Sequence, residues 1–215
     1  MPLDATDNGH RSVLAGFVED SGISDSIRQR LNGESSAQRA AALADLTEVG
    51  GEEAFGLITN AFDDSVIEVR NAAARALYEL NSDRAASFTR ALREALPERR
   101  RRIGAAIAGS GLAANALNSL SGEGRERTYD AYSLLFLMAK AGEVLPLLQA
   151  ISRHSNMDVR LAAVKLIALS NQQQVLSSLR NLASREALAP QVHAAVMEAI
   201  YSISTEAREN APSLA

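Results

Sequence analysis

A helical segment that recurs about every 30 residues is the feature that most limits how this chain can fold. Its clearest copy is VIEVRNAAARALYELN, residues 66–81. If Arg70 is taken as the origin, apolar residues follow at spacings of three and four, which places them on one face of a helix. These residues are Val69, Ala73, Ala76, Leu77 and Leu80. The segment therefore predicts an amphipathic helix that packs through a single face.

The same frame fits five other segments, whose origins are Arg39, Arg100, Asp130, Arg160 and His193. The copy at Asp130 departs most, because its apolar run from Leu134 to Met138 continues to a stop at Gly142. The eleventh position is glycine or asparagine in four copies, and both residues tolerate the positive φ that ends many helices. They are Gly50, Asn81, Gly111 and Asn171. Self-similarity at such a period is typical of a solenoid.

Shorter apolar segments with helical spacing lie between these helices, at residues 23–31, 54–62, 85–96, 112–120, 144–151 and 175–182. Each unit is therefore expected to be helix, turn, helix, and no segment alternates apolar and polar residues long enough to favour a strand. The prediction is an all-α fold, a right-handed α-solenoid of about six repeats over residues 23–204. We expect a tail with a possible capping helix at 1–22 and a second tail at 205–215.

Two segments carry a resemblance to a known family. DDSVIEVRNAAARALYEL (Asp63–Leu80) and SNMDVRLAAVKLIAL (Ser155–Leu169) resemble the second helix of bacterial HEAT and HEAT-like repeats, a family that includes the bilin-lyase-type repeats. The resemblance implies that the acid of the turn and the arginine after valine form contacts between repeats. Asp64 with Arg70, and Asn156 or Asp158 with Arg160, would then be structural. Such repeats serve many unrelated partners, so the resemblance does not give a function.

Composition excludes several classes of chemistry. The chain has no cysteine, so it has neither a disulfide nor a thiolate nucleophile. It has no apolar run long enough for a membrane span and no secretory signal at its start. We therefore expect a soluble, cytoplasmic protein without a cofactor. The sequence leaves open that the chain is one part of a longer protein, or that it associates with itself through its acidic and basic halves.

The two halves differ in charge. Residues 1–83 hold 15 acidic and 6 basic residues, whereas residues 84–215 hold 11 acidic and 16 basic ones. Four arginines are consecutive, Arg99 to Arg102, and consecutive residues point all round a helix, which favours a solvated helix start. The alternative is a patch from Arg84 to Arg127 that neutralises phosphates. A pI of about 5.5 and the absence of tryptophan argue against nucleic acid.

Catalytic residues are not grouped in this sequence. His10, His154 and His193 are far apart in the repeat order, which predicts no metal site, and the adjacent acids Asp63 and Asp64 suit a helix start. One cluster, Tyr129, Asp130 and Tyr132, resembles the aromatic cleft with a carboxylate of HEAT-like alkylpurine DNA glycosylases. The leading hypothesis is a non-catalytic scaffold for protein–protein interaction. The alternative is a nucleic-acid-binding or glycosylase-type protein acting through the arginine-rich middle.

In the family, second helices line the concave face of the solenoid, so a partner is expected there. Positions one, five and eight after each origin lie opposite the core, and they predict the binding residues. These are Asn71, Arg75, Tyr78, Arg101, Leu135, Met138, Leu161, Lys165, Glu198 and Tyr201. Leu135 and Met138 would form an apolar centre within a rim of charged and aromatic residues. They could equally be core residues of a fourth helix that is longer than the others.

Overall fold

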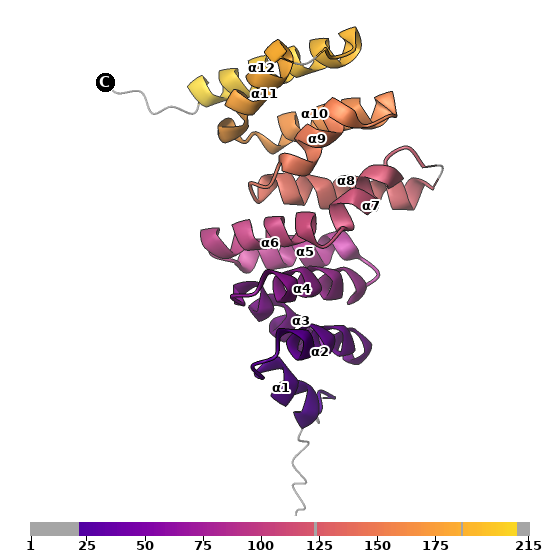
Figure 1. Cartoon of the computed structure of the whole chain (residues 1–215), viewed down its shortest axis with the longest axis vertical. Helices are drawn as coiled ribbons and strands as arrows, with labels where there is room; N and C mark the ends of the chain where they lie inside the picture. Colours follow the sequence, from indigo (N-terminus) through magenta and orange to yellow (C-terminus); the bar gives the residue numbers. More distant parts are fainter. Residues whose placement is uncertain (1–21, 123, 186, 210–215) are drawn as a thin grey trace, which may run out of the picture.

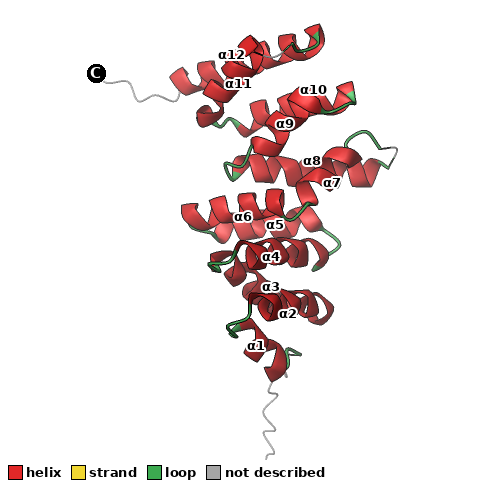
Figure 2. Ribbon diagram, in the orientation of Figure 1, coloured by secondary structure: helices red, strands yellow, loops and turns green. Residues whose placement is uncertain are grey.

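The computed structural model describes residues 22–122, 124–185 and 187–209, and these form a stack of helices in chain order along the long axis of the molecule (Figure 1). Short loops join the helices, and the described residues contain no strand (Figure 2). The predicted all-α solenoid is confirmed. None of the helices in the described ranges is long and apolar enough to span a membrane.

Each repeat is a pair of helices. The first helices are α1 (Asp25–Leu31), α3 (Gly51–Asn60), α5 (Arg84–Glu94), α7 (Leu112–Ser119), α9 (Leu145–Arg153) and α11 (Leu176–Arg185). Two 3₁₀ turns flank them, η1 (Ala61–Asp63) after α3 and η2 (Gln173–Val175) before α11. The expected capping helix within residues 1–22 lies outside the described part of the chain.

The second helices are α2 (Ser36–Val49), α4 (Ile67–Glu79), α6 (Pro97–Gly109), α8 (Arg125–Lys140), α10 (Met157–Ser170) and α12 (Pro190–Glu209). Each second helix packs against the next one along the chain. The last of them, α12, continues to Glu209, past residue 204 where the repeats were expected to end. All twelve predicted helical segments are therefore present, and the pairs follow the predicted order.

Local sequence explains where these helices begin. The side chain of Ser35 accepts a hydrogen bond from the backbone N–H of Gln38, and that of Asp83 accepts one from Ala86, so each satisfies an N–H that the helix leaves unpaired. Pro97 and Pro190 occupy the first helical position of α6 and α12, where no backbone N–H is needed.

Four of the second helices are followed by a residue with positive φ, as the sequence predicts. Gly50, Gly111, Gly142 and Asn171 have φ of 70°, 89°, 94° and 51°. The same prediction for Asn81 is wrong, because Asn171 is the one residue other than glycine with positive φ in the described ranges. Instead, α4 ends in an ordinary helical turn at Leu80, and the Asn81 amide donates to Ser87 Oγ at 3.1 Å.

The core runs the length of the stack between first and second helices. In α4 it contains Val69, Ala72, Ala73, Ala76 and Leu77, at most 7% exposed, in the predicted register. In α8 the buried residues are Ala131, Leu134, Leu135, Met138 and Ala139. These residues occupy the same positions relative to Tyr132 as the buried residues of α4 occupy relative to Arg70. The origin of the fourth copy is therefore Tyr132, and the expected origin at Asp130 is wrong. Leu135 and Met138 are fully buried and are core residues, not parts of a binding surface.

A second alignment, by the start of each helix, explains the mismatch. The fourth residue of α2, α4, α6 and α10 is the arginine of the pattern. The fourth residue of α8 is Thr128, four positions before Tyr132. Four residues are about one helical turn. The second helix of the fourth repeat therefore carries one extra turn at its start, and Asp130 lies midway between the two possible origins.

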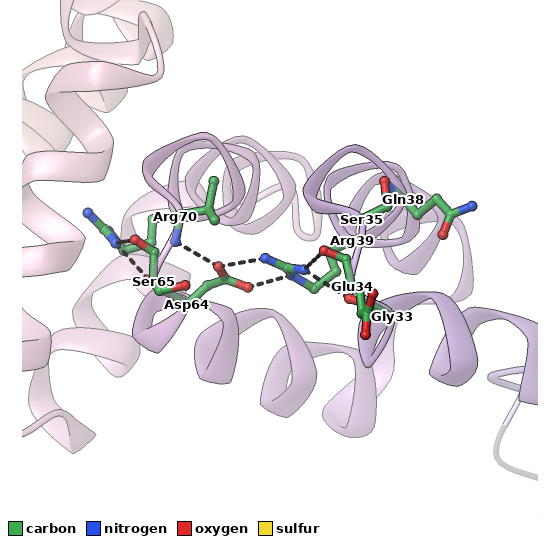
Figure 3. A network of polar contacts seen from close by, with 9 residues as sticks. Gly33, Glu34, Ser35, Gln38, Arg39, Asp64, Ser65 and Arg70 are labelled. Atoms are coloured by element: carbon green, nitrogen blue, oxygen red, sulfur yellow. Dashed lines mark hydrogen bonds and ion pairs between the residues drawn. The ribbon is translucent and has the colours of Figure 1, made fainter.

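An ion pair joins the first repeat to the second (Figure 3). Arg39 of α2 donates to the Asp64 carboxylate with both Nε and Nη2, at 2.7 and 3.0 Å, and both side chains are 14% exposed. Burial by itself raises the pKa of Asp64, but hydrogen bonds from Arg39 and from the Val66 N–H outweigh it and lower the pKa below its usual value. This contact links neighbouring repeats, as the family resemblance implies.

The partners within that contact differ from the expected ones. Arg70 binds the backbone carbonyls of Asp64 and Ser65, at 2.6 and 3.1 Å, and not the Asp64 carboxylate (Figure 3). Arg160 likewise donates to the Ile151 carbonyl at 2.7 Å, and Asn156 caps α10 through the Asp158 N–H. The arginine shared by α2, α4, α6 and α10 therefore closes the turn before its own helix.

Candidate functional site

An apolar groove of about 550 Å³ lies between α8 and α10. Its walls are three aromatic side chains of α8, Tyr129, Tyr132 and Phe136, and two leucines of α10, Leu166 and Leu169. Arg125, Thr128 and Ser133 complete the lining. Tyr129 and Leu169 are 69% and 55% exposed, so large apolar groups stand open to solvent here. Contiguous exposed apolar surface of this kind marks interaction sites.

The extra turn of α8 lies at one end of this groove and supplies two of its lining residues, Arg125 and Thr128. Relative to its core register, α8 begins about one turn earlier than α10, so its first residues extend past the start of the neighbouring helix. The loop between α7 and α8 projects further from the stack than the other loops in the view of Figure 1. Tyr129 comes directly after this overhang, and Tyr132 and Phe136 follow it at spacings of three and four, on the same side of the helix.

Thr128 takes over the closure of the turn in this repeat. Its hydroxyl lies 3.3 Å from the Ser119 carbonyl and 3.4 Å from the Gly122 carbonyl, the type of contact that arginine makes in other repeats. This contact therefore does not use the residue whose position, relative to the buried residues, corresponds to Arg70 of α4. In α8 the residue at that position is Tyr132. The Tyr132 side chain is half-buried, and its burial raises the pKa of the phenol.

Basic residues stand one turn beyond each end of the aromatic row. Arg125 precedes Tyr129 by four residues and lines the groove. Lys140 follows Phe136 by four residues, and its Nζ lies 6.0 Å from the centre of the Phe136 ring. This distance is at the outer limit of a cation–π contact. The groove thus has an apolar middle with a cation at each end.

The carboxylate nearest in sequence does not enter the groove. Asp130 lies 3.8 Å from Arg84 of α5, and the Arg84 guanidinium also binds the hydroxyl of Tyr78 at 3.0 Å and covers its ring. The expected cluster is therefore divided: Tyr129 and Tyr132 line a cleft, whereas Asp130 faces the third repeat. A cleft without its carboxylate lacks the acid that glycosylase-type chemistry requires of that cluster.

Comparison with known proteins agrees with the fold. A family model described as HEAT repeats matches residues 24–108. The chain is similar to HEAT repeats over this part of its length. Its match spans the first two repeats and most of the third, and α8, with its extra turn, follows the matched region. No curated protein sequence matches the chain.

Solved structures similar to this chain include engineered ones. One is the crystal structure of an engineered protein from a structural genomics consortium, with 16% identity over 83% of this chain and 95% of that chain, at a TM-score of 0.32. Another is a designed armadillo repeat protein, with 19% identity over 82% of this chain and 98% of that chain, at a TM-score of 0.29.

The expected binding residues fall into three groups. Arg75, Arg101, Lys165, Glu198 and Tyr201 are exposed, as a surface role requires. Asn71, Tyr78 and Leu161 are half-buried and make contacts within the solenoid. Leu135 and Met138 are fully buried, as described above. The sequence analysis missed the groove residues Phe136, Leu166 and Leu169, because none of them is one, five or eight positions after an origin.

The arginine cluster of α6 is largely neutralised inside the protein. Arg99 and Arg102 pair with Asp63, and Arg100 binds the carbonyls of Leu92 and Ala95 at 2.8 and 3.0 Å. Hydrogen bonding from Arg99 is the main cause that lowers the pKa of Asp63. Arg101 is the most exposed, at 71%, and lies 3.5 Å from Glu98. The cluster is mainly a set of structural contacts.

Metal ligands are not grouped in the described residues, where no three histidine or acidic side chains converge. His154 is part of a turn, since its Nδ1 accepts a hydrogen bond from the Asn156 N–H at 3.1 Å. This contact corresponds to the one between Asp64 and the Val66 N–H in the second repeat. His154 therefore has a local structural role that accounts for its position.

Proposed function

We propose that this protein is a non-catalytic scaffold of HEAT-like repeats, and that it binds a partner protein on the solvent-exposed surface of the second helices α8, α10 and α12. We call this surface the second-helix surface and define it by the groove between α8 and α10 together with Lys165, Glu198 and Tyr201. The observation that carries the proposal is the exposure of Tyr129 and Leu169 at an apolar groove. Aromatic and arginine residues around an apolar centre are the composition of protein-binding sites.

Two observations favour a protein over nucleic acid as the partner. Nucleic-acid binding needs unpaired cations that can neutralise phosphates, but Arg99, Arg100 and Arg102 are bound within the protein. The groove also offers leucine and phenylalanine walls, with a single charged residue among its lining side chains. A mainly apolar surface gains free energy by excluding water from a partner's apolar side chains.

The test is an affinity capture from the native lysate with the purified protein as bait, with and without nuclease. We expect a protein that survives nuclease treatment and that, once purified, binds directly to the wild-type chain. Simultaneous replacement of Lys165, Glu198 and Tyr201 with alanine, combined with Tyr129→Ser, should weaken this direct binding. Retention of nucleic acid instead, with a steep loss as salt concentration rises, would contradict the proposal.

A further inference from the structure

Resting on the proposed function, we infer that the groove between α8 and α10 binds one amphipathic helix of the partner, whose apolar side chains enter the groove and whose carboxylates lie about one turn beyond each end. The shape of the groove and the position of its charges support this assignment independently. The lining residues indicate that the bound segment of the partner is a helix, and the cations beside them indicate which charges that helix carries.

The length of the aromatic row suits a helix. Tyr129, Tyr132 and Phe136 are at positions i, i+3 and i+7 of α8, so they extend about 10 Å along its axis. A bound amphipathic helix presents its own apolar anchors at i, i+3 or i+4, and i+7, over the same length. Leu166 and Leu169, one turn of α10, form the opposite wall. A third helix can thus lie in the crevice between two neighbours and contact both.

The charges favour an acidic helix. Arg125 stands at one end of the aromatic row and Lys140 at the other, each one turn outside it. No carboxylate lines the groove in the described structure. Asp130 is paired with Arg84, and the other acids of the two helices, Glu126 and Asp158, are not among the lining residues. A helix with glutamate or aspartate flanking its anchors is attracted at both ends, and one with lysine there is repelled.

The probe for this inference is a phage-displayed library of helix-forming peptides selected against the purified full chain. Enriched peptides should carry apolar residues at i, i+3 or i+4, and i+7, with acidic residues one turn outside them. Labelled synthetic copies of an enriched peptide, and of its version with lysine in place of each acid, are then titrated by fluorescence anisotropy. We expect the acidic peptide to bind at least about tenfold more tightly than the lysine version.

Variants and matched controls locate the binding. Tyr129→Ser and Leu169→Ser remove the two most exposed groove side chains, and each should weaken the acidic peptide about tenfold or more. Leu96→Ser and Leu145→Ser are the controls, because these residues have similar exposure, 77% and 57%, but lie outside both the groove and the second-helix surface. Exchange of both cations in the double variant Arg125→Glu/Lys140→Glu should reverse the preference between the acidic and the lysine peptide. Circular dichroism checks that each variant keeps its helices.

Several outcomes overturn the inference while the proposed function stands. One is the enrichment of proline-rich or basic peptides. Another is equal affinity of the protein for the acidic and lysine versions of the peptide. A third is a peptide whose affinity falls with Tyr201→Ser but not with Tyr129→Ser. Displacement of the peptide by a fluorescent fatty acid at the same residues would instead assign the groove to a small apolar ligand. If the protein enriches no peptide and captures only nucleic acid from the lysate, both the inference and the proposed function fail.

Discussion

The second and fourth repeats use the same helix pair in different ways. In the second, Arg70 closes the turn before α4 and the Asp64 carboxylate pairs with Arg39 of the preceding repeat. In the fourth, Thr128 closes the turn, and Gly122 takes the place of the acid. The two repeats differ by one extra helical turn. In the fourth repeat, this extra turn places the residue that binds the preceding loop four positions before the residue in the core register. The residue in that register, Tyr132, is then available to line a groove.

The difference explains why binding and stability are expected in separate places. The second repeat directs its charged side chains at backbone carbonyls and at its neighbour, which stiffens the stack. The fourth repeat keeps a buried face like that of α4 but exposes Tyr129 next to its extra turn. An insertion of one turn therefore changes the start of a second helix next to the candidate groove, while the register of the buried residues is the same as in α4.

The largest expected effect tests the claim that the two repeats share a core. Leu77→Ala in α4 and Leu135→Ala in α8 should each lower the free energy of unfolding by about 2–5 kcal/mol, because both side chains are fully buried. Met138→Asp should prevent folding, since it places a charge in the core. Urea unfolding followed by circular dichroism measures the change. A stable Met138→Asp protein that had lost only partner binding would return this residue to the surface.

The ion pair of the second repeat should be the next largest effect. Asp64→Asn should lower the melting temperature at neutral pH, because it leaves Arg39 without its carboxylate. The pKa of Asp64 is lowered in the folded state, so the stabilisation is present above the unfolded pKa of about 4 and disappears as pH falls below it. The melting temperatures of the wild type and of Asp64→Asn should therefore converge in acid.

A matched variant sharpens this test. Asp63→Asn removes the adjacent carboxylate, whose side chain is 42% exposed and pairs with Arg99 and Arg102. Exposed pairs contribute little because solvent screens them. Asp63→Asn should therefore cost less than Asp64→Asn. An equal cost for the two variants would show that the contact between the first two repeats has no special role.

Closure of the turns gives a smaller effect that compares the repeats directly. Arg70→Ala should cost about 1–2 kcal/mol, since it removes charged donors to two carbonyls. Thr128→Ala should cost about 0.5–1 kcal/mol, since a neutral hydroxyl makes weaker and longer contacts. Both are measured by urea unfolding. If Thr128→Ala changes nothing, Thr128 is not the substitute for the arginine.

The smallest effect concerns Tyr132. Tyr132→Phe removes the hydroxyl and keeps the ring, so stability should change by no more than about 0.5 kcal/mol. Burial raises the pKa of Tyr132 above 10.0, because it disfavours the charged phenolate. In a spectroscopic titration of phenolate absorbance, Tyr132→Phe should remove a component that ionises above the usual pKa range of tyrosine. Loss of an early component instead would contradict the burial of this ring.

The sequence was sufficient for the fold but only partly for the site. The spacing of apolar residues, with proline at helix starts and glycine or asparagine after helix ends, predicted each helix pair, because these effects depend on residues close in the chain. A constant interval of 30 residues misplaced the register of α8 and made Leu135 and Met138 look exposed. The extra turn changes how far the start of α8 extends past the start of α10. This arrangement depends on packing between repeats.

The aromatic residues of α8 were a signal that the sequence did contain. Tyr129 and Tyr132 were singled out beside Asp130, yet their interpretation as part of a catalytic cleft assumed that all three faced the same way. Because successive residues of a helix are about 100° apart, Asp130 turns toward Arg84 while the tyrosines turn toward α10. A helical projection in the correct register separates them and groups Phe136 with the tyrosines.

Hydrogen–deuterium exchange with and without a saturating selected peptide tests the central claim most directly. If the groove is the binding site, protection should increase over residues 125–136 of α8 and over residues 166–169 of α10, and exchange in α2 and α4 should stay the same. Protection confined to α2, α4 or α6, with α8 unchanged, would contradict the assignment of recognition to the fourth repeat.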